Sequence, residues 1–273
     1  MTNGLDYNKS EQYTLSIRLS TDGFSFSIYN PISGGDFYHR TYPINTQRSM
    51  AANVKAFLAA TEELKHKFKH VNILVHSQRY TIVPLELFED EQMENIFYQN
   101  VKEIKNETVL CNILGKSNSV ILFSLDKLAH LLLSEHFTSA RFFSSISPQI
   151  EYLSAKSRQG NSRKMYVNIH TENIDVICIN KGRLLLVNSY LSPNCSDIIY
   201  YILNIWKNLE YDQRRDELHI TGRDETRKEI IKELQKYISH VYSINPHAEF
   251  TSSEYNVKIE DIPFDIQSLI LCE

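Results

Sequence analysis

Residues 165–190, MYVNIHTENIDVICINKGRLLLVNSY, are the stretch that indicates the fold most directly. Two segments rich in apolar and β-branched residues, 165–180 and 183–190, flank the turn Asn180-Lys181-Gly182. A glycine-containing turn between two such segments predicts a long β-hairpin. The polar run 159–164 before it predicts the turn that leads into this hairpin.

A similar hairpin is predicted near the N-terminus. Leu15, Ile17 and Leu19 alternate with polar residues, the pair Asp22-Gly23 follows, and the alternation resumes over residues 24–28. Because side chains alternate between the faces of a strand, this spacing places one face of each strand on a core. A third strand is predicted over residues 38–42.

The two halves of the chain share an order of predicted elements: a hairpin, further strands, a helix and a strand. In the first half we expect helices at 50–68, 89–97 and 126–133 and strands at 71–75, 80–83, 108–114 and 119–123. The second half is predicted to begin near Thr138, with a strand at 140–144, a helix capped by Ser147-Pro148, a helix at 196–209, a strand at 218–220, a helix around 230–238, a strand at 240–244 and an irregular tail. This pattern indicates an α/β protein.

The repeat resembles the actin-like ATPase fold, in which two ribonuclease-H-like lobes form one molecule. The segment Val167-Asn168-Ile169-His170, continued to Gly182, resembles the second phosphate hairpin of that superfamily, and Leu218-His219-Ile220-Thr221-Gly222 resembles its adenosine-contacting strand and glycine. The whole chain is similar to an uncharacterised Bacteroidetes family with this fold, itself distantly similar to cytoplasmic actin-like proteins of type IV pilus and type II secretion assembly. The resemblance implies an N-terminal lobe over residues 1–137 and a C-terminal lobe over residues 138–273.

If a nucleotide binds, the resemblance places Gly23, Asn168, His170 and Gly222 at its site. Asn168 stands where the superfamily has an aspartate and His170 where it has a glycine. In the first hairpin the aspartate position falls on Arg18 or Thr21 and the glycine position on Ser20 or Gly23, depending on register. An arginine repels Mg²⁺ and a Cβ crowds a phosphate, so these departures predict loss of ATP hydrolysis and no bound ATP or Mg²⁺.

Other motifs give no catalytic or metal-ligating residue. Gly115-Lys116-Ser117 lacks the first glycine of a P-loop and is predicted to be a hairpin turn. His66 and His70, spaced for one helix face, have no third ligand and are predicted to lie in a solvated helix end. The Gly-x-Ser-x-Gly and Gly-x-Gly-x-x-Gly signatures are absent, and four separated cysteines predict reduced thiols.

Composition limits the remaining function classes. The 273 residues carry 29 Lys and Arg against 33 Asp and Glu, a net charge of -4, which argues against nucleic-acid binding. The N-terminus lacks a signal-peptide pattern and no window is apolar over about 18 residues, so we expect a cytoplasmic protein without membrane insertion. We therefore predict a non-catalytic scaffold or adaptor that binds a protein partner. The alternative is an ATP-binding actin-like or sugar-kinase-like protein with diverged phosphate loops.

Overall fold

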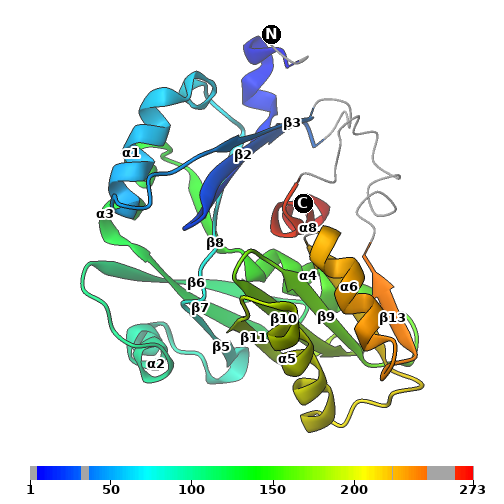
Figure 1. Cartoon of the computed structure of the whole chain (residues 1–273). Helices are drawn as coiled ribbons and strands as arrows, with labels where there is room; N and C mark the ends of the chain where they lie inside the picture. The colour runs from blue at the N-terminus through cyan, green and yellow to red at the C-terminus, as the bar shows by residue number, and fades with distance from the viewer. Residues whose placement is uncertain (1–4, 32–36, 223, 245–261, 273) are drawn as a thin grey trace.

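A computed structural model describes residues 5–31, 37–222, 224–244 and 262–272, which form three β-sheets flanked by helices (Figure 1). The first sheet has the strand order β3-β2-β1-β4-β8 and the second has the order β11-β10-β9-β12-β13. A smaller sheet with the order β5-β7-β6 is formed by the part of the chain between β4 and β8, which themselves pair in the first sheet.

The strands have the following bounds. The first sheet contains β1 (Thr14–Ser20), β2 (Gly23–Tyr29), β3 (Phe37–Tyr42), β4 (His70–Val75) and β8 (Ala140–Ser144). The second contains β9 (Lys164–Ile169), β10 (Asn173–Asn180), β11 (Arg183–Leu191), β12 (Glu217–Gly222) and β13 (His240–Ser243). The small sheet contains β5 (Tyr80–Pro84), β6 (Glu107–Leu114) and β7 (Ser119–Asp126).

The two large sheets repeat one topology. In each, three antiparallel strands formed by consecutive segments are extended on one side by two parallel strands. Thus β9 pairs antiparallel with β10 and parallel with β12, as β1 does with β2 and β4. The repeat predicted from hydrophobic pattern is present in the strand order.

Helices pack on both sides of the first sheet and around the second (Figure 1). They are α1 (Met50–Ala60), α2 (Met93–Asn100), α3 (Lys127–His136), α4 (Ile146–Ser157), α5 (Cys195–Asn208), α6 (Asp224–Leu234) and α8 (Phe264–Cys272), with short 3-10 helices at Tyr7–Gln12, Glu62–Lys65, Leu85–Leu87 and Asp90–Gln92. The red helix α8 in Figure 1 packs on the first sheet through Ile266, Leu269 and Ile270, which meet Tyr29 and Leu74.

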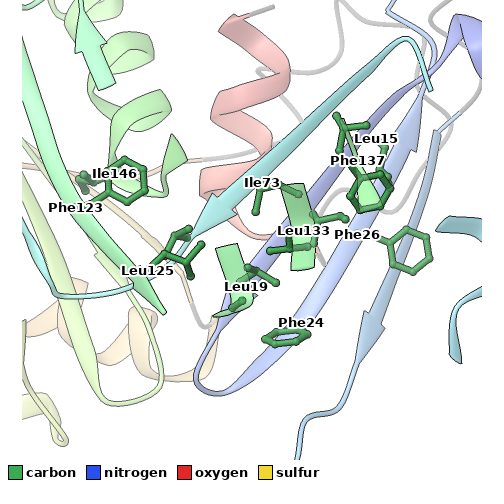
Figure 2. Close-up of a cluster of buried hydrophobic side chains, with 14 of the residues drawn as sticks. Leu15, Leu19, Phe24, Phe26, Ile73, Phe123, Leu125, Leu133, Phe137 and Ile146 are labelled. Carbon is green, nitrogen blue, oxygen red and sulfur yellow. The ribbon is translucent and has the colours of Figure 1, made fainter. Parts of the chain in front are cut away.

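A single apolar cluster extends from the first sheet to the second. Around β1, β2 and β4 it includes Leu15, Leu19 and Ile73. Figure 2 shows Leu19 and Ile73 near Leu133 of α3, and Leu15 beside Phe137, which follows that helix. The same cluster contains Ile177 and Ile179 of β10. Burial of this shared apolar surface favours a fixed arrangement of the two sheets.

Both faces of β1 and nearly all of β2 are buried, which the alternating pattern alone does not predict. Leu15, Ile17 and Leu19 face the apolar cluster, while Arg18 reaches Asp265 of α8. The tail expected to be irregular contains this helix, and that prediction was wrong for residues 264–272. Residues 245–261 lie outside the described part of the chain. Because α8 is buried on nearly all sides, it lacks the amphipathic periodicity that identifies surface helices.

Several other predicted boundaries were wrong. The helix expected over residues 50–68 ends at Ala60, so His66 follows a 3-10 turn and His70 begins β4 rather than sharing a helix face with it. The segment 165–180 is two strands, β9 and β10, because His170 begins a turn. Helix α4 starts at Ile146, and Ser147 donates to Asn112 instead of capping.

The strand at 140–144 is present as predicted, but it pairs with β4 in the first sheet. It therefore does not belong to the second sheet, although it follows residue 137. The boundaries 1–137 and 138–273 stay a prediction.

Arg79 and Glu107 tie together the outer strands of the small sheet. Two guanidinium nitrogens of Arg79 donate to the two carboxylate oxygens of Glu107, at 2.6 and 3.1 Å. Burial raises the pKa of Glu107, but the hydrogen bonds from Arg79 and Ser124 outweigh it and hold that pKa below its usual value of 4.5. This stabilisation is present above about pH 4.5 and is lost as the pH falls through the lowered pKa.

We predict that Glu107→Gln lowers the free energy of unfolding at pH 7 by about 1.5 kcal/mol, the usual worth of a hydrogen bond to a charged group. The difference from the wild type should shrink at an acidic pH below the lowered pKa of Glu107, where the wild-type carboxylate is protonated. Urea unfolding at the two pH values measures both effects, with the exposed Glu94→Gln as control. An equal loss at both pH values would contradict the assigned ionic contact.

Candidate functional site at the junction of the sheets

The β1–β2 turn of the first sheet and the β9–β10 turn of the second lie near one cluster of polar side chains. His76 directly follows β4, and its backbone N–H donates to the carbonyl of Leu19 at 2.8 Å, which extends the parallel pairing beyond the strand. Ser145 immediately precedes α4, and its N–H likewise donates to the carbonyl of Val75 at 2.9 Å. The carboxyl ends of parallel strands thus bring these two side chains to one edge, the position where open α/β sheets commonly bind ligands.

Arg18 of β1 and Asp265 of α8 form a buried ion pair at this junction. Arg18 Nε donates to Asp265 Oδ2 at 2.7 Å, and the side chains are only 9% and 1% exposed. The N–H of Ile266 donates to the other oxygen of Asp265 at 2.8 Å, so both carboxylate oxygens are engaged. Arg18 also lies 4.0 Å from Asp22 in the β1–β2 turn.

On the other side of the junction, His170 and Asp175 form a second buried pair. His170 Nε2 donates to Asp175 Oδ2 at 2.7 Å, and the hydroxyl of Ser189 donates to Asp175 Oδ1. The hydroxyl of Tyr80, in the small sheet, is 3.0 Å from that of Ser189. Burial raises the pKa of Asp175, but the charge and hydrogen bond of His170, together with His76 and the hydrogen bond of Ser189, outweigh burial and lower this pKa to about 2.

His76 lies against His170, with 4.4 Å between the ring centroids. Its Nδ1 shares a 3.1 Å hydrogen bond with the hydroxyl of Ser145. Burial lowers the pKa of His76 to about 4, and the nearby Arg18 contributes in the same direction, so the ring is neutral at pH 7. Among the described residues, His76, His170 and Asp175 are the one group of three potential metal ligands, with donor atoms within 4.8 Å of one another.

The structure places three of the four predicted nucleotide-binding residues near one another. Asn168 and His170 are at the end of β9, and Gly222 ends the adjacent β12, opposite Ile169. Gly23 begins β2 in the other sheet. Asn168 is opposite Asp175 across the β9–β10 pair and lies 3.4 Å from the Gln149 side chain of α4.

The residues at the junction do not fit a magnesium–nucleotide site. Mg²⁺ takes oxygen ligands, whereas the group of potential ligands here is two imidazoles and a single carboxylate, with the Arg18 guanidinium nearby. The hollow beside Asn168, lined also by Gln149, Asp175 and Thr221, is too small to admit a water molecule. Ligand pockets usually have volumes of roughly 300–1,000 Å³.

Two glycines in the predicted site have a conformational explanation. Gly222 has φ +107° and packs so closely on β9 that an added Cβ would meet the Ile169 carbonyl oxygen and approach its nitrogen to 2.8 Å. Gly23 has φ +155° at a hairpin turn, where a Cβ would make only ordinary contact, 3.7 Å from the Tyr42 carbonyl oxygen.

The sequence analysis missed several residues of the junction: His76, Asp175, Asp265, Ser145, Ser189 and Tyr80. Two of them carried usable signals. Asp175 is a lone carboxylate within an apolar strand, and a buried charge needs a partner. His76 directly follows a buried strand, where parallel sheets place functional side chains. Asp265 gave no such signal because its helix was not recognised.

Comparison with known proteins identifies the family. Residues 2–241 match the family model described as Protein of unknown function (DUF3822). The chain belongs to the DUF3822 family.

A crystal structure from Bacteroides thetaiotaomicron VPI-5482, described as a protein with actin-like ATPase fold and unknown function, is 44% identical to this DUF3822 chain. It aligns over 98% of this chain and 99% of its own, with a TM-score of 0.86. The PilM-PilN type IV pilus biogenesis complex matches at 11% identity over 95% of this chain and 98% of that chain, with a TM-score of 0.58, which shows a shared fold alone. The predicted actin-like ATPase fold and the predicted family resemblance are thereby confirmed.

A search of curated proteins finds no significant match to this DUF3822 protein. None of the helices in the described ranges combines the length and apolarity needed to cross a bilayer.

We predict that Gly222→Ala destabilises the protein more than Gly160→Ala. Both glycines have positive φ, but an added Cβ at Gly160 meets nothing within 4 Å. The control should therefore lose only the conformational cost of about 1–2 kcal/mol, while Gly222→Ala loses this plus the cost of displacing β9. Urea unfolding measures the two losses, and equal losses would show that β9 does not require a glycine here.

Proposed function

We propose that this DUF3822 protein is a non-hydrolysing member of the actin-like fold that acts in the cytoplasm as a scaffold or adaptor, by binding a protein partner. The observation that carries the proposal is the packing of Arg18, Asp265, His76, His170 and Asp175 at the junction where the fold's nucleotide-binding turns meet. These groups satisfy one another, and binding a triphosphate there requires their displacement. Fold alone does not determine function, so the argument depends on these side chains.

The exposed edge of the second sheet supports a protein partner. β11 is an edge strand with Leu191 62% exposed, and Tyr200 on the nearby α5 is 63% exposed. Tyr190 of β11 stacks on Tyr201 of α5 at 4.7 Å between ring centroids, which joins the strand and the helix into one surface. Edge strands bind extended peptides through backbone hydrogen bonds, and tyrosines are enriched at protein interfaces. A protein of the same fold, PilM, is found in a complex with PilN.

A thermal-shift titration of the full chain with ATP, ADP and GTP, each with and without Mg²⁺, tests the proposal. A nucleotide at about 100 times its Kd stabilises a protein by about 2.7 kcal/mol. For domains of 150–250 residues each kcal/mol raises Tm by about 2–4 °C, so binding is easily seen. We predict no change in Tm at millimolar nucleotide beyond that caused by Mg²⁺ alone.

A Mg²⁺-dependent rise in Tm with ATP would overturn the proposal and favour the ATP-binding alternative. The variant His170→Gly would then show where the nucleotide binds. Removal of an imidazole that crowds a phosphate should increase the shift, whereas a nucleotide bound elsewhere should give the wild-type shift.

A further inference from the structure

The side chains at the junction also form a set of metal donors, which goes beyond the proposed partner binding. We propose that His76, His170 and Asp175 bind one divalent transition-metal ion, with Zn²⁺ as the expected ion, and that this ion joins the two sheets. His76 comes from the end of β4 in the first sheet, and the other two ligands come from the β9–β10 hairpin of the second. An ion held by all three therefore crosses the junction.

The spacing of the donor atoms is close to that of a metal site. Zn²⁺ binds imidazole nitrogen and carboxylate oxygen at about 2.0–2.2 Å, so two donors on one tetrahedral ion are roughly 3.3 Å apart. His170 Nε2 and Asp175 Oδ2 are 2.7 Å apart, and all three donor atoms lie within 4.8 Å of one another. Small side-chain rotations bring the three donors to coordination distance.

Two of the three ligands, His76 and Asp175, are already oriented by a second side chain, as is usual for metal-binding residues. Ser145 Oγ holds His76 at Nδ1, and Ser189 donates to Asp175 Oδ1. The backbone N–H of His170 donates to the carbonyl of Asn173 at 2.9 Å, which fixes the turn. Ligands that are already held close to their binding positions lose little conformational entropy when the ion binds.

The local charge favours a dication even though an arginine is nearby. Arg18 is neutralised by Asp265 at 2.7 Å and is also 4.0 Å from Asp22. Asp175 contributes a further carboxylate within the donor set. Two carboxylates therefore offset the charge of Arg18, and the ligand set of two imidazoles and one carboxylate suits Zn²⁺, Fe²⁺, Co²⁺ or Ni²⁺ rather than Mg²⁺.

Metal binding replaces the hydrogen bond between His170 and Asp175 with bonds from both side chains to the ion. The Nε2 proton that His170 donates to Asp175 must leave that nitrogen: an imidazolium releases it to solvent, and a neutral ring changes to the tautomer with the proton on Nδ1. The Nε2 lone pair and the carboxylate oxygen then bind the ion. Three protein ligands leave a fourth position of a tetrahedral ion for water. No oxidation or reduction takes place.

The test is a titration of the untagged, EDTA-stripped full chain with Co²⁺, followed by visible absorption and then by competition with Zn²⁺. We expect one equivalent of Co²⁺ to produce the intense bands of a four- or five-coordinate ion and Zn²⁺ to remove them. His170→Gln and Asp175→Asn should each weaken Co²⁺ affinity by at least about 100-fold, more than the loss of a supporting group does.

The matched control is His219→Gln. His219 Nε2 is 2.9 Å from Glu217 Oε2, so it forms a histidine–carboxylate pair in the second sheet outside the proposed donor set. This variant should bind Co²⁺ like the wild type. Far-ultraviolet circular dichroism confirms the folding of each variant, and anomalous diffraction at the zinc edge from Zn²⁺-soaked wild-type crystals locates the ion without any variant.

The proposal is supported by an anomalous peak between His76 and His170. It is overturned if Co²⁺ keeps the spectrum of the aqueous ion, if His219→Gln weakens binding as much as His170→Gln, or if the anomalous peak lies elsewhere. The Co²⁺ titration contains no nucleotide, so its result tests the metal site alone. The thermal-shift experiment with nucleotides tests the proposed function separately.

Discussion

The buried ion pair between Arg18 and Asp265 is the constraint on which the rest of the junction depends. A guanidinium under a helix is destabilising unless a carboxylate meets it, and Asp265 meets it at 2.7 Å with its own second oxygen bound by the backbone. The pair joins the central strand of the first sheet to the last helix of the chain. It thereby holds α8 against the face of the first sheet to which β1 contributes Arg18 and its polar neighbours Ser16 and Ser20. It also places the positive charge of Arg18 near His76.

That charge and the surrounding burial determine the chemistry of the neighbouring groups. His76 stays neutral at pH 7 because burial and Arg18 both disfavour its charged form, whereas Asp175 stays ionised because His170 and Ser189 satisfy both its oxygens. The result is a junction that combines a neutral imidazole with an ionised carboxylate.

The sequence was sufficient to predict the repeated topology, and insufficient to predict the junction. Alternating residues and glycine turns depend on local geometry, so both hairpins and the order of elements along the chain could be inferred from pattern. Asp265, the partner of Arg18, is 247 residues away in the sequence. His170, the partner of Asp175, lies across a turn within a segment that was predicted to be one strand. Contacts between residues so far apart in the sequence form only when the chain folds. Helix α8 is buried on nearly all sides, so its sequence lacks the apolar periodicity that would identify it as a helix and show which face packs on the sheet.

The most direct test of this account is a double-mutant cycle on Arg18→Met and Asp265→Leu, measured by urea unfolding at pH 7. Each single variant leaves an unpaired buried charge and should lose about 3–5 kcal/mol, while the double variant should be more stable than either single variant. That result would show that the two side chains stabilise the junction only as a pair. Losses that simply add in the double variant would contradict the account, because each residue would then act independently of the other.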